Sequence, residues 1–411
     1  MPKAKTGLKD DNSYVPSKQI LEKYADLLIN FALNSGEGVK PNEVVEYYIP
    51  EIAKPLALPM QNAILKAGAI PMLRFVPDGL DKDYFKLANA QQLQFYPEEF
   101  MKAKSELLNH QVSIIADVDP EELKDVDPDK IMLARNSKKA YRDLLFRKEE
   151  QGNFTWTLGL WATPAKAKEV GMTLKEYWQE IIKGCYLDKK DPVQEWKDLF
   201  VRLESTRKAL NDLKIEWLHV TGPDADLKIK LGPDRIFAGG SGRNIPSYEL
   251  FTSPDWRGTE GWVRFNHPLY RYGNKLKDIR LEFENGVITK ATAKTGQKVL
   301  DSMLKTKDAD KIGEFSLTDK RISRITKPMA ETLFDENMGG KYGNMHLAIG
   351  SSYHDCYRGD QSKPTKEEWA KMGYNDSAEH TDIVTTTPRT VTATLANGSK
   401  VVIYKDGEYL V

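Results

Sequence analysis

Six side chains that can bind metal ions follow one another in the C-terminal part of this 411-residue chain. They are Glu249, Glu314, Glu336, His346, His380 and Asp382. Carboxylates and imidazoles together suit a divalent ion such as zinc, cobalt, manganese or magnesium. A catalytic zinc site uses three protein ligands and keeps one position open. Six candidates are more than one ion needs, so the sequence predicts two neighbouring ions.

His380 and Asp382 form the sharpest local pattern among these residues. Residues two apart on a strand project from the same face, so the imidazole and the carboxylate can share an ion. The next residues, Ile383 and Val384, favour a strand here. Taken alone, the pair fits an exposed strand edge with a chance histidine and aspartate equally well.

The other four candidates each have an ordinary structural explanation. His346 lies in an apolar stretch, where a histidine is more often a hydrogen-bonded core residue than a ligand. Glu336 fits a helix end or a loop, and Glu314 fits the solvated start of a strand. Glu249 lies in a stretch that otherwise reads as a buried strand, and a carboxylate there needs a partner such as a cation. Spacing alone therefore supports a metal site only in part.

The elements that must position these residues change character along the chain. In the N-terminal half, strand patterns over 44–49, 70–76 and 112–118 alternate with helix patterns over 55–67 and 97–108. This order predicts an α/β fold with a mostly parallel sheet. No phosphate-binding glycine motif occurs in its turns, so we interpret this half as a scaffold.

The C-terminal half is predicted to be α+β and rich in antiparallel strands. An amphipathic helix over 193–213 ends the first half, which places a domain boundary near residue 213. The expected domains are a scaffold domain, 1–213, and a metal-binding catalytic domain, 214–411. Asn-Gly pairs at 285–286 and 397–398 predict tight hairpins in the second domain.

Composition narrows the classes of function. Sixty basic residues balance sixty acidic ones without a basic block, which disfavours nucleic acid and anionic membranes as partners. No apolar run is long enough to span a bilayer or to form a signal peptide. Two distant cysteines, Cys185 and Cys356, are typical of a reduced cytoplasmic protein. The motifs of zincin proteases and of serine hydrolases are absent from the sequence.

Several sequence blocks occur in the order typical of one enzyme family. The most specific are 312–317 (IGEFSL), 333–337 (LFDEN), 346–350 (HLAIG) and 375–382 (NDSAEHTD), preceded by 243–255 (RNIPSYELFTSPD). With them, nearly the whole chain resembles the thermophilic metalloaminopeptidase family that includes aminopeptidases T and S and PepS. The resemblance implies a metal-dependent enzyme that hydrolyses the N-terminal peptide bond of peptides with a free amino end.

The resemblance also implies roles for individual residues. All six candidates match the family's metal ligands, and Glu314 matches the carboxylate that bridges both ions. Tyr353 matches a tyrosine close to the metals, where it is expected to donate a hydrogen bond to the developing oxyanion. We expect Glu314 to act as the general base. The connection from Glu336 to His346 is longer than in the family, so the chain departs from the family pattern at this ligand. A homodimer is implied by the resemblance alone.

Two rival interpretations remain open from the sequence. A dinuclear phosphoesterase also uses carboxylate and histidine ligands, and it needs basic residues near them. Arg321, Arg324 and Lys327 lie close to Glu314 in the sequence and are the candidates for that role. The second rival is a metal-binding homologue without activity, which the six intact ligand positions argue against.

Residues around the expected ligands carry further expectations. Asp335 and His354 are candidates to orient the metal-binding histidines through hydrogen bonds. Tyr48, Trp256 and Trp262 stand where the family pattern suggests smaller or more polar residues. These three either reshape a substrate pocket or repack a core, and we favour repacking.

Overall fold

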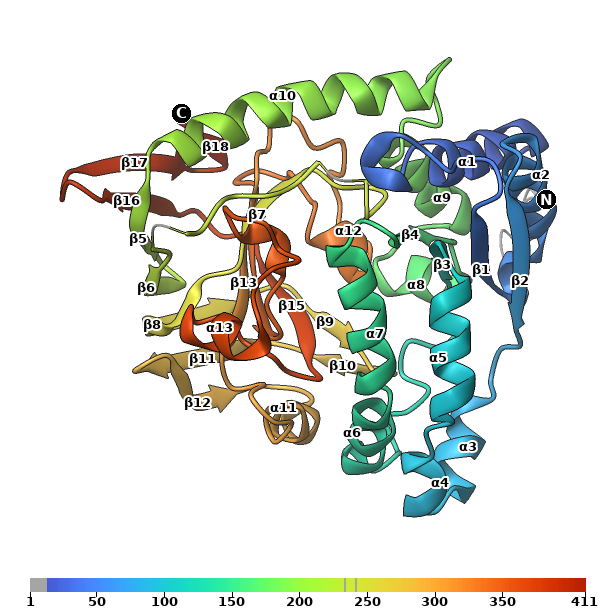
Figure 1. Cartoon of the computed structure of the whole chain (residues 1–411), viewed down its shortest axis with the longest axis horizontal. Helices are drawn as coiled ribbons and strands as arrows, with labels where there is room; N and C mark the ends of the chain where they lie inside the picture. Colours follow the sequence, from blue (N-terminus) through green and yellow to red (C-terminus); the bar gives the residue numbers. More distant parts are fainter. Residues whose placement is uncertain (1–12, 233, 241) are drawn as a thin grey trace, which may run out of the picture.

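The N-terminal half is built on a parallel sheet of four strands. The computed structural model describes residues 13–232, 234–240 and 242–411. The strand order is β2 (Ile70–Val76), β1 (Val44–Pro50), β3 (His110–Ile115) and β4 (Thr155–Leu160). All three pairings are parallel, as the alternation of strands and helices predicted. β2 lies at the outer right-hand edge of the molecule in Figure 1.

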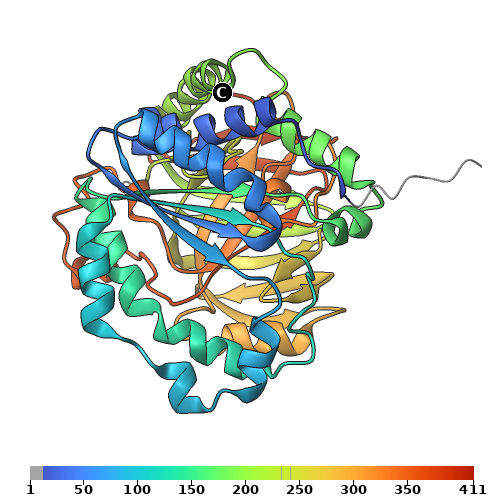
Figure 2. The ribbon, with the colours of Figure 1, turned by 90° about the vertical axis from the view of Figure 1, so that its right-hand side faces the viewer.

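Helices cover both faces of this sheet. α1 and α2 pack on the face that carries Val45 and Tyr47, and α5 and α7 cover the face that carries Val44 (Figure 2). The helices of this half are α1 (Lys18–Asn30), α2 (Lys54–Lys66), α3 (Asp81–Leu87), α4 (Ala90–Gln94), α5 (Glu98–Leu107), α6 (Pro128–Ser137), α7 (Lys139–Glu150), α8 (Pro164–Glu169), α9 (Leu174–Gly184) and α10 (Pro192–Asp212), with short 3₁₀ turns at Asn34–Gly36 and Glu51–Ala53.

The C-terminal half contains two antiparallel sheets and a small two-stranded ribbon. The larger sheet has the order β12 (Val287–Thr292), β11 (Ile279–Glu284), β8 (Asp255–Phe265), β6 (Ala225–Lys230), β5 (Ile215–Gly222), β16 (Thr390–Leu395), β17 (Lys400–Lys405) and β18 (Glu408–Tyr409). The ribbon consists of β9 (Leu269–Arg271) and β10 (Asn274–Leu276). The predicted hairpin at 285–286 joins β11 to β12, because Asn285 and Gly286 both take the positive φ that such a turn requires.

The smaller antiparallel sheet positions the candidate ligands. Its order is β15 (His380–Thr385), β14 (Asn344–Gly350), β13 (Ile312–Thr318) and β7 (Glu249–Thr252). The remaining elements of this half are α11 (Gln297–Leu304), α12 (Thr332–Asp335), the 3₁₀ turn η4 (His354–Cys356) and α13 (Lys366–Lys371). One face of the sheet carries Phe315, Leu347 and Ile383, which are fully buried in the hydrophobic core. The opposite face is therefore free to carry polar side chains.

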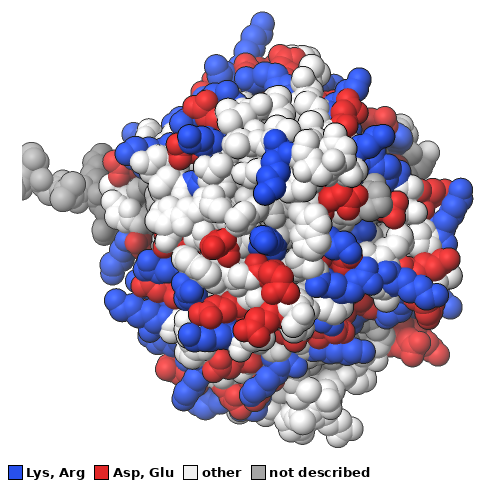
Figure 3. All heavy atoms as spheres, turned by 90° about the vertical axis from the view of Figure 1, so that its left-hand side faces the viewer, with Lys and Arg blue, Asp and Glu red and all other residues white. Residues whose placement is uncertain are grey.

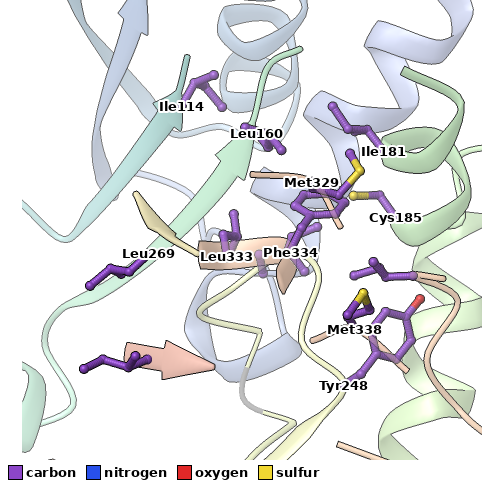
Figure 4. Packing of buried hydrophobic residues seen from close by; sticks show 14 of the residues in the cluster. Ile114, Leu160, Ile181, Cys185, Tyr248, Leu269, Met329, Leu333, Phe334 and Met338 are labelled. Atoms are coloured by element: carbon purple, nitrogen blue, oxygen red, sulfur yellow. The ribbon is translucent and has the colours of Figure 1, made fainter. Parts of the chain in front are cut away.

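The two halves share one hydrophobic core. Figure 4 shows Leu160 and Ile181 of the N-terminal half beside Leu333 and Phe334 from the region of α12. α10 runs along the top of Figure 1 from the first half to the second and ends at Asp212, close to the expected boundary. The fold class inferred from the sequence is confirmed. The division into two separate domains stays a prediction, because this core is continuous across it.

The apolar character of the helices and the distribution of surface charge bear on possible partners. Within the described ranges, no helix combines the length and apolar character that crossing a membrane requires. On the face that carries β16 and β17, the described basic and acidic side chains are intermixed rather than gathered by sign (Figure 3). This face therefore offers no large area of one charge to a polyanion.

Candidate metal centre

The register of the smaller sheet brings four of the six candidates onto one face. Glu314 on β13 lies opposite Ala348 on β14, and Ala348 lies opposite Asp382 on β15. Residues two apart on a strand share a face, so His346 and His380 project to the same side as this row. The small Ala348 side chain stands between the two carboxylates and leaves room above it.

Short distances then join these side chains into one cluster. His346 Nε2 lies 3.1 Å from Glu314 Oε1 and 3.2 Å from Glu249 Oε2. His380 Nε2 lies 3.5 Å from Asp382 Oδ1 and 3.7 Å from Glu314 Oε2. Polar atoms this close around a common centre fit a metal site, because cations bind between such atoms.

The candidate ligands form three overlapping groups whose ligand atoms lie within 4.8 Å of one another. The groups are Glu249 with Glu314 and His346, Glu314 with His380 and Asp382, and Glu336 with His346 and Asp382. Glu314, His346 and Asp382 each take part in two of these groups, so the groups share side chains. In the part of the chain that the structure describes, these are the groups of this kind.

Glu249 and Glu336 reach the cluster from outside the three central strands. Glu249 is the first residue of the edge strand β7, and its carboxylate accepts a 2.6 Å hydrogen bond from the Ser316 hydroxyl. Glu336 directly follows α12 and accepts a 3.1 Å hydrogen bond from the Asn244 amide. The Thr318 hydroxyl donates to the backbone carbonyl of Glu336 at 3.2 Å. The long connection to His346 therefore does not remove Glu336 from the cluster.

A backbone carbonyl, and not the side chains that the sequence suggested, orients His380. His380 Nδ1 lies 2.8 Å from the backbone carbonyl of Ser351, which fixes its ring so that Nε2 faces the carboxylates. Asp335 instead pairs with His267 at 3.0 Å, and His354 pairs with Glu150. The expectation that Asp335 and His354 hold the ligand imidazoles is wrong, because each is bound to another partner.

Burial and mutual repulsion make the cluster costly without cations. Burial, together with the charges of Glu314 and Asp382, raises the pKa of Glu249 to about 7 against the opposing effects of His346 and the Ser316 hydroxyl. Burial and neighbouring carboxylates likewise hold the pKa values of Glu314 and Glu336 well above the usual range. Asp382 Oδ1 is buried and has no hydrogen-bond partner. These donors fit divalent cations, which would offset both the repulsion and the missing partner.

Tyr353 lies at the edge of the cluster, just before η4. Its ring packs edge-on against His380 with centroids 4.7 Å apart and against Phe251 at 6.0 Å. Burial raises the pKa of Tyr353 well above its normal value, and the nearby Glu314 and Asp382 charges add to this. The hydroxyl therefore stays protonated near neutral pH and is available as a hydrogen-bond donor.

A cavity opens onto the cluster and shows which residues sequence reasoning missed. Besides the six candidates and Tyr353, it is lined by Trp156, Arg243, Asn244, Ser247 and Phe251. Trp156 comes from β4 in the N-terminal half, and no local signal marks it. Arg243, Ser247 and Phe251 lie within the 243–255 block, which resembles the family as a whole and therefore gave no reason to single them out.

Other residues flagged from the sequence lie away from this cavity. Arg321 pairs with Asp319, and Arg324 pairs with Asp188 at 2.9 Å. Neither these arginines nor Lys327 line the cavity, so the three residues do not form the basic cluster that a phosphoesterase needs there. The aromatic substitutions at 48, 256 and 262 do not line it either.

Comparison with known proteins identifies the family. The model of the thermophilic metalloprotease family M29 matches residues 17–409. The chain belongs to this family. The resemblance seen in the sequence blocks is thereby confirmed. A metalloprotease needs a divalent metal, and the cluster of glutamates, histidines and an aspartate is a candidate site for it.

Three relatives match this chain over almost their entire length. Aminopeptidase PepS of Streptococcus thermophilus is 28% identical over 96% of this chain and 98% of its own. Aminopeptidase AmpS of Bacillus subtilis (strain 168) is also 28% identical, over 95% and 98%. Aminopeptidase T of Thermus aquaticus is 27% identical over 95% of this chain and 98% of its own. The structure of wild-type AmpT from Thermus thermophilus shares the fold, with a TM-score of 0.80, 24% identity and coverage of 96% and 100%.

Proposed function

We propose that this M29 metalloprotease is an aminopeptidase that removes the first residue of peptides. For this reaction it uses two divalent ions, which the six clustered side chains hold. The charge of the cluster carries the proposal. Glu249, Glu314, Glu336 and Asp382 supply four negative charges when ionised, and the two histidines bind as neutral ligands. Two divalent cations balance that charge, whereas one leaves two buried carboxylates uncompensated.

The ions that suit these donors are zinc, cobalt, manganese or magnesium. Such ions supply Lewis acidity at the scissile carbonyl and lower the pKa of a water molecule. Glu314 accepts a proton at a carboxylate oxygen as the water oxygen attacks the carbonyl carbon, and it returns the proton to the leaving amide nitrogen. Tyr353 donates a hydrogen bond to the carbonyl oxygen as negative charge develops there.

Metal removal and substrate choice test the proposal together. The purified protein is expected to contain two ions per chain by elemental analysis and to lose activity after chelation, with recovery when zinc, cobalt, manganese or magnesium is restored. It should release the first residue from unblocked peptides and leave N-acetylated copies of the same peptides intact. Equal cleavage of blocked and unblocked peptides contradicts an aminopeptidase, and hydrolysis of phosphate esters alone favours the rival phosphoesterase.

The raised carboxylate pKa values add a pH signature to metal binding. Because the pKa of Glu249 is about 7, this carboxyl is mainly protonated below pH 7 when cations are absent. Ions must then displace protons, so apparent metal affinity should fall as the pH drops below 7. Calorimetric titration of the chelated protein in two buffers of different ionisation enthalpy measures the proton release. No release at pH 6 contradicts the assignment of Glu249 as a ligand.

The homodimer implied by the resemblance has a candidate surface on β2. This strand pairs with β1 on one side, and no strand among the described residues pairs with its other edge. Five large apolar side chains on it are each at least 36% exposed, namely Ile70, Met72, Leu73, Phe75 and Val76. An exposed apolar edge strand is suited to pairing with another strand. An antiparallel pair of β2 strands related by a twofold axis satisfies this edge in both copies.

A charge placed on this edge should separate the copies. Phe75→Lys puts a cation in the apolar contact, where its burial is unfavourable. Light scattering should show a dimer for the unmodified protein and a monomer for the variant. The matched control is Val201→Lys on α10, where the original side chain is 71% exposed. A monomer before any substitution, or an intact dimer after Phe75→Lys, contradicts this interface.

The cytoplasm is the compartment we assign to this enzyme. Cys185 and Cys356 are both free thiols and both buried. Burial raises the pKa of each thiol, which keeps it protonated and unreactive. Neither cysteine forms a disulfide that would favour an oxidising compartment.

A further inference from the structure

The cavity over the cluster of candidate ligands is lined by one residue of the N-terminal half, Trp156. Every other lining residue comes from the C-terminal half. Trp156 and Phe251, with the Tyr353 ring, make up its aromatic surface. A peptide whose first carbonyl lies at the cluster must place its first side chain close by, so these rings are available to contact it.

Backbone pairing between the halves carries Trp156 to this position. The segment 242–245 runs along the free edge of β4, with Leu158 N–H donating to the Arg243 carbonyl at 3.1 Å. Ile245 N–H donates to the Leu158 carbonyl at 3.2 Å. The Glu149 carboxylate beside the indole lies 2.8 Å from the Arg243 guanidinium. The ring is therefore held before any substrate binds, and a preorganised wall loses little entropy on binding.

The charged groups around this wall already have partners. Arg243 is paired with both Glu149 and Asp355, and the Asn244 amide donates to Glu336. The remaining carboxylates and imidazoles face the proposed ions. A charged side chain entering this space would find no free partner of opposite sign, and burying it there is costly. An apolar side chain loses nothing comparable and gains contact with the rings.

We propose that Trp156 and Phe251 bind the first side chain of the substrate and give the enzyme a preference for peptides with an apolar first residue. This inference rests on the proposed aminopeptidase function and assigns the N-terminal half a direct part in substrate choice. Trp156 acts as a specificity-determining residue, because it contacts the side chain that distinguishes one substrate from another.

Rates on a panel of aminoacyl anilides with leucine, phenylalanine, alanine, lysine or glutamate test the proposal. The unmodified holoenzyme should show its highest kcat/KM with leucine or phenylalanine. Trp156→Ala should lower kcat/KM for the leucyl substrate at least about 10-fold, the scale of a lost apolar contact, with much less change for the alanyl one. Trp156→Phe keeps a ring and should retain most of the preference. Trp217→Ala, at a partly exposed tryptophan on β5, is the matched control.

Each other outcome has a distinct meaning. An equal loss for all five substrates, or a loss of bound metal, shows that Trp156 only supports the fold and overturns the proposal. Fastest cleavage of the lysyl substrate also overturns it and points to a cation over the indole ring instead. An unmodified enzyme that cleaves none of the five, although metal-loaded, refutes the aminopeptidase function itself.

Discussion

Glu314→Gln is expected to lower kcat/KM for an unblocked peptide about 10²- to 10⁴-fold, the range that a lost general base typically costs. The Glu314 carboxylate reaches both halves of the cluster, with Oε1 3.1 Å from His346 and Oε2 3.7 Å from His380. Glutamine has the same shape, but its amide cannot accept the proton of the attacking water. The substitution also removes one of the four negative charges that balance two divalent ions. Steady-state rates on unblocked peptides measure the loss.

The readouts beside activity separate the two roles of Glu314. If Glu314 is a base that does not bridge ions, the Glu314→Gln variant keeps two ions per chain. If Glu314 is a bridging ligand, the variant binds fewer ions. The matched control is Glu282→Gln on β11, whose carboxylate pairs with Arg280 and Lys290 away from the cavity. Turnover of the Glu314 variant at the rate of this control removes Glu314 from the catalytic site.

Much of the centre could be predicted because its signals are local. His380 and Asp382 are two apart on a strand, and the neighbouring Ile383 and Val384 indicated that strand in the sequence. Glu249 looked costly in a buried strand, and β7 is indeed buried along its length. Such patterns follow from the alternation of faces along one strand. The sheet register that joins the strands into one site does not follow from any single pattern. The family blocks implied the ligand set but not this register.

The remaining residues could not be predicted because their contacts join segments that lie far apart in the sequence. Trp156 reaches the cavity only when segment 242–245 pairs with the edge of β4, and nothing near Trp156 in the sequence signals that pairing. Asp335 looked like an orienting group for a ligand, yet it pairs with His267 from the loop between β8 and β9. Such partners depend on tertiary packing, which local patterns do not encode.

Asp382→Asn is expected to empty the centre of metal and to abolish activity while leaving the fold intact. Asp382 Oδ1 lies 3.5 Å from His380 Nε2 and 3.8 Å from His346 Nε2, so it contributes to two of the three groups. Burial raises its pKa, but His380, His346 and Arg271 together outweigh this effect and lower that pKa, so the carboxylate is charged at neutral pH. An asparagine keeps the shape and loses the charge that attracts a cation.

Metal analysis and thermal unfolding check this result together. Ions that bind only the folded protein raise its melting temperature in proportion to the logarithm of their concentration. Chelation should therefore lower Tm for the unmodified protein and leave Tm of Asp382→Asn unchanged. The matched control is Asp376→Asn in the same sequence block, where the carboxylate pairs with Lys139 and Lys366 instead. If Asp382→Asn still holds two ions and responds to chelation like this control, Asp382 binds no metal and the negative charge of the centre must be balanced by another arrangement of ligands.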